Sequence, residues 1–90
     1  MDCLFCRVIR GEIPAARVYE DDRIIAFRDI HPQAPLHVLV VPREHIATLN
    51  DFAPHHDDLV GAMVRVGAAV AREHGYGDRG YRTVFNCNTE

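Results

Sequence analysis

A histidine interrupts the most apolar run of the chain and is the first residue whose type suggests chemistry. The run covers residues 35–42 and reads PLHVLVVP, with His37 as its one titratable side chain. A buried histidine needs a hydrogen-bond partner for each ring nitrogen. The residues alone leave two interpretations open: His37 is a satisfied core residue, or it belongs to a buried polar site.

Two cysteines near the N-terminus have the spacing of a metal or redox site. Cys3 and Cys6 form a C-x-x-C pair, and residues three apart share one face of a helix. With one histidine they would supply three ligands suited to zinc. The alternative is a pair of buried free thiols. Spacing does not select the histidine, because six compete: His31, His37, His45, His55, His56 and His74.

Other polar residues carry weaker signals. Asp29 follows an apolar stretch and precedes a proline-rich loop, so it is either a solvated turn former or an acceptor for two sugar hydroxyls. His55 and His56 stand at a predicted helix start and are expected to be a solvated pair. Cys87 is given no role. The chain has no serine, which excludes a serine nucleophile, and it contains no Walker loop, G-x-G-x-x-G or H-E-x-x-H motif.

The elements that position these residues follow from hydrophobic spacing. A short helix is expected between a cap at Asp2 and an end at Gly11. A hairpin is predicted with strands over residues 17–20 and 23–27, because Asp21-Asp22 is a plausible tight turn. Residues 36–41 are predicted to form a strand that is covered on both faces.

A long helix is predicted from Pro54 to Gly75, followed by a strand over residues 80–86. Leu59, Met63, Val66 and Val70 form its core stripe. A second stripe of Val60, Val64, Gly67 and Ala71 either lies on the sheet or meets another subunit. The element order predicts an α+β fold with a largely antiparallel sheet.

Length and composition limit the classes of function. Ninety residues make one small domain, residues 1–90, with an ordinary 48% hydrophobic content. The net charge of −3 predicts no broad attraction to nucleic acid or to an anionic membrane. No apolar run approaches the roughly 20 residues of a membrane span, and no signal peptide is recognisable, so a cytoplasmic protein is expected.

Several segments, taken in order, resemble the histidine-triad (HIT) superfamily, Hint branch. They are GEIPA, YEDD, AFRDI, PQAPLHVLVVP and REHI, followed by GYRTVFNCN after the long helix. The resemblance covers nearly the whole chain. It implies a purine nucleotide-binding hydrolase acting on phosphoramidate or phosphoanhydride bonds at the α-phosphate, and a homodimer built on the long helix and the strand after it.

The resemblance also implies roles for individual residues. Asp29 would hold the ribose hydroxyls, and Asn86 would lie near the phosphate. His37 would support a catalytic histidine, which explains an imidazole in an apolar strand. Zinc would be a structural metal in those relatives that bind it. The implied purine wall is Leu4, Phe5, Val8, Phe27 and Ile30, and the implied zinc ligands are Cys3, Cys6 and His45.

One part of the family pattern does not occur in residues 1–90. The His-x-His-x-His run expected on a strand after NCNTE is missing, and in relatives its middle histidine attacks phosphorus. The chain is therefore expected to be a fragment, a truncated product or one piece of a site completed elsewhere. Residues 1–90 on their own are predicted to be inactive. The alternatives are a non-catalytic nucleotide-binding module and a zinc-stabilised structural protein.

Overall fold

The computed structural model describes residues 3–29, 32 and 34–85. Internal contacts divide the chain into two compact units, residues 1–43 and residues 44–90, which are described in turn. The single-domain assignment stays a prediction.

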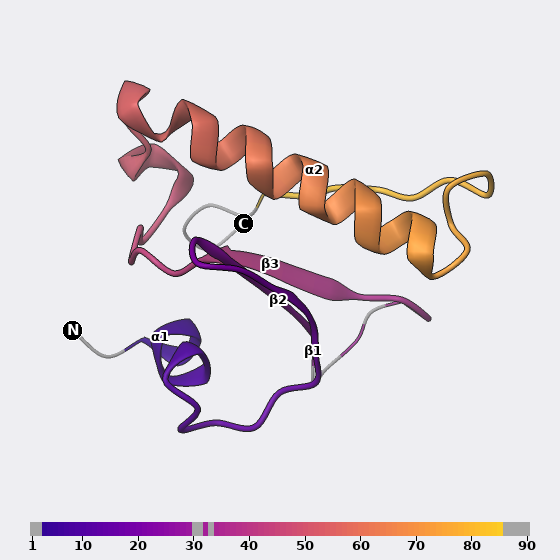
Figure 1. The fold of residues 1–90 in the computed structure, drawn as a ribbon, viewed down its shortest axis with the longest axis horizontal. Helices are drawn as coiled ribbons and strands as arrows, with labels where there is room; N and C mark the ends of the chain where they lie inside the picture. The colour runs from indigo at the N-terminus through magenta and orange to yellow at the C-terminus, as the bar shows by residue number, and fades with distance from the viewer. Residues whose placement is uncertain (1–2, 30–31, 33, 86–90) are drawn as a thin grey trace. The chain divides into compact units, whose positions relative to one another are not determined.

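The first unit is a short helix followed by a three-stranded sheet (Figure 1). Helix α1 spans Leu4–Ile9, and strands β1, β2 and β3 span Arg17–Glu20, Ile24–Arg28 and Val38–Pro42. The strands lie in the order β1-β2-β3, and both neighbouring pairs are antiparallel. Together with one long helix in the second unit, this confirms the predicted α+β class.

Strand β2 is the centre of this sheet and is buried on both faces. Its side chains alternate as predicted, and Ile25 and Phe27 share the face that packs against α1. They form a core cluster with Val8 of α1 and Val41 of β3. A small helix is therefore fixed to the sheet by apolar burial rather than by its own propensity.

The hairpin turn is held by one aspartate. Asp21 Oδ1 accepts hydrogen bonds from the backbone N–H groups of Arg23 (2.8 Å) and Ile24 (2.7 Å), and Oδ2 accepts one from the hydroxyl of Tyr19 (2.6 Å). The Tyr19 hydroxyl lowers the pKa of Asp21 most, and the backbone donors act in the same direction. The Asp21 carboxylate thus closes the turn that the sequence predicted at Asp21-Asp22.

Helix α1 begins one residue later than the sequence predicted. Asp2 was the expected cap, whereas Cys3 is the N-cap residue: its backbone is extended and its Sγ accepts the N–H of Cys6 at 3.1 Å. The Cys3 thiol thus satisfies a backbone N–H of the first helical turn, the role that the Asp2 carboxylate was expected to have. Gly11 has a φ of +79° and follows the helix end, as predicted.

His37 lies just before β3, not inside it. The predicted strand over residues 36–41 is shifted, because the ladder with β2 starts at the pair Arg28–Val38 and ends at the pair Ile24–Pro42. The main chain of His37 still accepts a hydrogen bond from the N–H of Asp29 at 2.9 Å. The imidazole therefore stands at the open end of a strand pair.

The second unit contains the long helix α2, Asp57–Glu73, and two preceding 3₁₀ turns, Leu49–Asp51 and Pro54–His56. Gly75 has a φ of +87° just past the helix, as predicted for its end. All four residues of the predicted core stripe are buried: Leu59, Met63, Val66 and Val70. The second stripe is mixed, with Val64 48% exposed and Ala71 buried.

Residues 80–85 do not form the predicted strand. They carry alternating apolar side chains, but a strand also requires backbone pairing, and within the described residues no partner strand bonds to them. Tyr81, Val84 and Phe85 are exposed at 46–58%. Asn86 lies outside the described residues.

The prediction of a solvated histidine pair is half wrong. His55 is exposed, but His56 is only 7% exposed. Its Nδ1 accepts the N–H of Ala53 at 2.9 Å, and its Nε2 lies 3.1 Å from a carboxylate oxygen of Glu44. His56 is thus a buried cap for the turn before α2, with both ring nitrogens paired.

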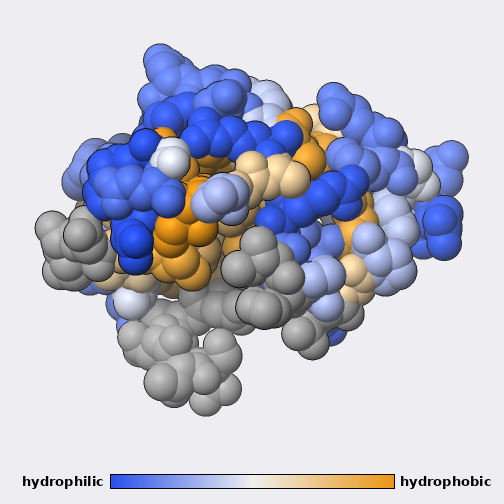
Figure 2. All heavy atoms as spheres, turned by 90° about the horizontal axis from the view of Figure 1, so that it is seen from below, coloured by the Kyte–Doolittle hydropathy of each residue, from blue (hydrophilic) through white to orange (hydrophobic). Residues whose placement is uncertain are grey.

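Polar side chains cover much of the molecular surface in view, with apolar ones showing between them (Figure 2). No described helix combines the length and the apolar character that crossing a membrane would require.

Candidate functional site

The first unit carries an apolar wall built by α1 and β2. Val8 and Phe27 form its buried base, each 4% exposed. Phe5 lies beside this base, with its ring centroid 6.2 Å from that of Phe27 and the two planes tilted by 49°. Phe5 is 40% exposed and Leu4 is 55% exposed. An exposed aromatic ring on a buried apolar base is suited to packing against a flat apolar ring.

Helix α1 is held against the sheet near its C-terminal end. A guanidinium nitrogen of Arg17, on β1, donates a hydrogen bond to the carbonyl oxygen of Val8 at 3.2 Å. That carbonyl lies in the last turn of the helix and also accepts the backbone N–H of Gly11 at 3.0 Å. The hydrogen bond and the apolar packing of Val8 together hold Phe5 beside β2.

A carboxylate and an imidazole face each other at the end of the β2–β3 pair. Asp29 Oδ2 lies 3.5 Å from His37 Nε2, and the side chains are 21% and 30% exposed. The backbone bond from Asp29 to His37 fixes both residues at this end. At 3.5 Å the contact is longer than a good hydrogen bond. Asp29 therefore has a fixed backbone and a half-buried carboxylate, which suits recognition of paired hydroxyls.

The sequence predicted that Asp29 and the strand bearing His37 lie around one cleft, but it did not predict the direct contact between the two side chains. The signal was available in the hairpin register: antiparallel pairing of β2 with β3 brings the residue after Arg28 opposite the residue before Val38. Of the predicted site residues in the first unit, Phe27 packs with Val8 in the core cluster and beside the ring of Phe5. Asp29 lies beside His37. Ile30 and Asn86 lie outside the described residues.

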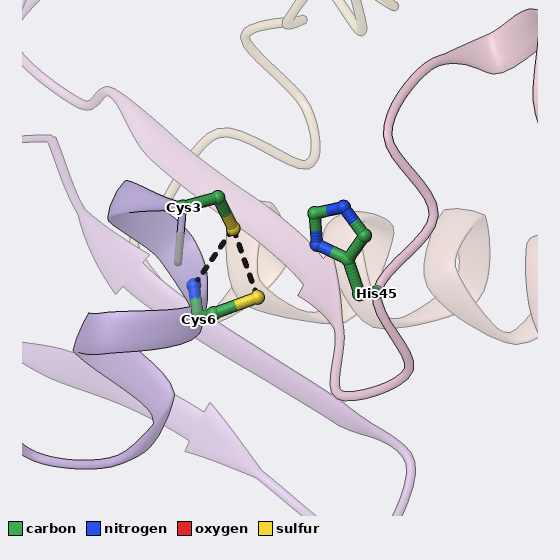
Figure 3. A group of neighbouring side chains, drawn as sticks. All are labelled: Cys3, Cys6 and His45. Carbon is green, nitrogen blue, oxygen red and sulfur yellow. Dashed lines mark hydrogen bonds between the residues drawn. The ribbon is translucent and has the colours of Figure 1, made fainter. Parts of the chain in front are cut away.

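The two cysteines at the start of α1 also face each other (Figure 3). Their Sγ atoms are 2.9 Å apart and share a hydrogen bond. This hydrogen bond lowers the pKa of Cys3 and raises the pKa of Cys6, and backbone N–H groups of Cys6 and Phe5 lower that of Cys3 further. Both thiols are half-buried. Two sulfur atoms on one helical face are a suitable half of a zinc site.

His45 is drawn with the cysteines in Figure 3. It follows the last residue of β3 by three positions and is an exposed residue at the start of the second unit. As a ligand it would contribute an imidazole nitrogen, which is compatible with zinc alongside two thiolates.

Comparison with known proteins gives consistent similarities. The family model described as "Scavenger mRNA decapping enzyme C-term binding" matches residues 2–90. The purine nucleoside phosphoramidase of Escherichia coli K12 is 44% identical over 87 residues, which are 97% of this chain and 73% of that protein. Protein HitA of Neisseria gonorrhoeae is 41% identical over 85 residues, covering 94% of this chain and 78% of its own length.

Solved structures show the same similarity in three dimensions. A HIT family hydrolase from Legionella pneumophila has a TM-score of 0.94 and 46% identity, covering 98% of this chain and 79% of its own. A histidine triad protein from Clostridium difficile has a TM-score of 0.92 and 44% identity, covering 99% and 77%. The similarity extends through both units of the chain.

Proposed function

This chain belongs to the histidine-triad (HIT) superfamily, and from that premise we propose that its first unit binds the nucleoside part of a purine nucleotide substrate. The observation that carries the proposal is the half-buried Asp29 carboxylate at the end of the β2–β3 pair, in the same unit as the wall of Phe5, Val8 and Phe27. The base would pack on the wall, and the carboxylate would accept the two ribose hydroxyls.

The proposed reaction is hydrolysis of a phosphoramidate or phosphoanhydride bond at the α-phosphate of the nucleotide. The name of the Escherichia coli relative, a purine nucleoside phosphoramidase, supports this substrate class. In this chain Asp29 and the wall would bind and orient the nucleoside, and His37 would position a catalytic histidine by hydrogen bonding. Residues 1–90 contain no His-x-His-x-His run that could provide that histidine. Orientation of the nucleoside is thus the part of catalysis assigned to these residues.

Asp29→Asn is expected to weaken binding of AMP about tenfold, because hydroxyl hydrogen bonds to a charged acceptor are worth roughly 1.5–3 kcal/mol. Isothermal titration calorimetry measures the affinity. The sharper measurement compares AMP with 2′-deoxy-AMP, which lacks one of the two hydroxyls. The original protein should prefer AMP, and the Asp29→Asn variant should show a smaller preference.

Asp22→Asn is the matched control, because Asp22 is an exposed carboxylate in the hairpin turn of the same unit. It should leave both affinities unchanged. An equal loss of AMP affinity in both variants, or an unchanged ribose preference in the Asp29 variant, would contradict the assignment. No heat with millimolar AMP would argue against nucleoside binding by these 90 residues.

We also propose that Cys3 and Cys6 hold a structural zinc ion with His45 as a third ligand, as the family resemblance implies, in a cytoplasmic protein whose thiols stay reduced. Protein purified without chelator should contain about one zinc per chain, measured by elemental analysis. Cys3→Ser should remove most of it, whereas Cys87→Ser should not. Zinc-free protein from fresh, reduced preparations would contradict the proposal.

The proposed assembly is a homodimer that uses α2. Val64 projects from this helix with 48% of its surface exposed, and Val60 and Gly67 beside it are half-buried. Small and apolar side chains in one stripe allow close packing of a second helix. A molar mass of two chains by light scattering is the expected result, and Val64→Glu should shift it toward one chain.

A further inference from the structure

We propose that Cys3 and Cys6 are a reversible disulfide site, and that the disulfide and zinc exclude each other. The C-x-x-C spacing allows both metal binding and redox chemistry. The proposed zinc site accounts for the metal binding but not for the redox chemistry. The proposal goes beyond the nucleotide function and does not depend on it.

The separation of the two sulfur atoms is the first observation. At 2.9 Å they are about 0.9 Å farther apart than the sulfurs of a disulfide, which are about 2.05 Å apart. They are also about 0.9 Å closer than two thiolates on a tetrahedral zinc ion, since Zn–S bonds of about 2.3 Å place the sulfurs about 3.8 Å apart. The reduced pair therefore lies midway between the two bonded states, and small side-chain rotations reach either one.

The helix supplies the second observation. Cys3 is the N-cap and Cys6 follows three positions later, so their side chains point to the same side of one turn. Within a helix, Cβ atoms three residues apart are roughly 5–6 Å apart, farther than the roughly 3.5–4.5 Å of a disulfide, but the backbone of Cys3 is extended and not helical. Cys3 is at the edge of the helix with an extended backbone, so it can adjust without unwinding the turn. Both residues are half-buried and accessible to small oxidants.

The chemistry is an exchange with a low-molecular-weight disulfide such as oxidised glutathione. One cysteine thiolate attacks a glutathione sulfur, forms a mixed disulfide and releases one glutathione thiolate. The other cysteine attacks the bound cysteine sulfur, forms the Cys3–Cys6 bond and releases the second glutathione thiolate. Two electrons pass from the cysteines to glutathione, and the two thiol protons go with them. The oxidised pair has no thiolate left for zinc, so the metal must leave.

The test treats zinc-free and zinc-loaded protein with oxidised glutathione and then digests it with trypsin. Both cysteines fall in one peptide, residues 1–7, and Cys87 falls in another, residues 83–90. The expected product is peptide 1–7 lacking two hydrogen atoms, resistant to alkylation and restored by dithiothreitol. In the loaded protein, zinc released to a colorimetric chelator should equal the disulfide formed, and zinc should slow the oxidation severalfold.

Variants separate this site from other thiols. Cys6→Ser should stop at the mixed disulfide on Cys3, and Cys87→Ser should behave as the original protein. The Cys3–Cys6 disulfide proposal would be overturned by a disulfide that joins peptide 1–7 to peptide 83–90. It would also be overturned if both cysteines of peptide 1–7 could still be alkylated under conditions that modify Cys87. Zinc that remains bound when the disulfide is complete would overturn the exclusion. Because the peptide is also read in zinc-free protein, failure of the zinc proposal is distinguishable from failure of this one.

Discussion

A polypeptide of residues 1–90 is expected to hydrolyse an adenosine phosphoramidate no faster than buffer does, even when its nucleoside site is saturated. Enzymes of ordinary efficiency exceed the uncatalysed rate by about six orders of magnitude or more. That acceleration requires a nucleophile aimed at phosphorus and donors for the developing charge. The described histidines of the chain do not provide this nucleophile.

Each described histidine either contacts another group or lies outside the proposed nucleoside site. His37 faces the carboxylate of Asp29. His56 is buried, with one ring nitrogen bonded to the N–H of Ala53 and the other against Glu44. His74 has its Nδ1 2.9 Å from a carbonyl oxygen of its own helix. His45 is the proposed zinc ligand, and His55 is exposed in the 3₁₀ turn before α2.

The measurement is release of the amine from an adenosine phosphoramidate, with the purine nucleoside phosphoramidase of Escherichia coli as the active reference in the same assay. His37→Ala is the informative variant. Turnover by residues 1–90 that disappears in His37→Ala would contradict the supporting role given to His37, since the imidazole would then carry the reaction itself.

Most of the first unit could be predicted from sequence because its signals are local and consistent. Alternation in β2 placed Ile25 and Phe27 on one face, and both lie in the core cluster. The Asp21-Asp22 turn was expected from turn chemistry and is held by the Asp21 carboxylate. The bounds of β3, which starts two residues and ends one residue later than expected, were not predictable in this way, because strand ends depend on the partner strand and not on hydropathy.

Features that depend on tertiary contacts were missed. Residues 80–85 have the pattern of a strand but lack a partner among the described residues, and the pattern alone cannot supply one. His56 was expected to be solvated, because its neighbours in sequence are polar. One of its partners in the structure is Glu44, twelve residues earlier, which no local pattern links to it. The direct contact between the side chains of Asp29 and His37 was missed for a similar reason, since it follows from the register of two strands.

Phe27→Ala is expected to lower the free energy of unfolding by about 3–5 kcal/mol, since truncation of a buried phenylalanine removes apolar contacts and leaves a cavity. Phe27 is 4% exposed and belongs to the cluster that joins α1 to the sheet. Folded domains have a total free energy of unfolding of roughly 5–15 kcal/mol, so this loss is a large part of the stability. Urea unfolding followed by circular dichroism measures the change.

Two other phenylalanines separate stability from binding. Phe85→Ala should change stability by less than about 0.5 kcal/mol, because Phe85 is 46% exposed. Phe5→Ala should cost little stability but weaken AMP binding about tenfold, because stacking on an aromatic ring is worth roughly 1–3 kcal/mol per base. If Phe27→Ala does not fold, Phe27→Leu, expected to lose about 1–1.5 kcal/mol, still reports the core contribution. A Phe5 variant that binds AMP normally would show that the exposed ring is not part of the purine wall.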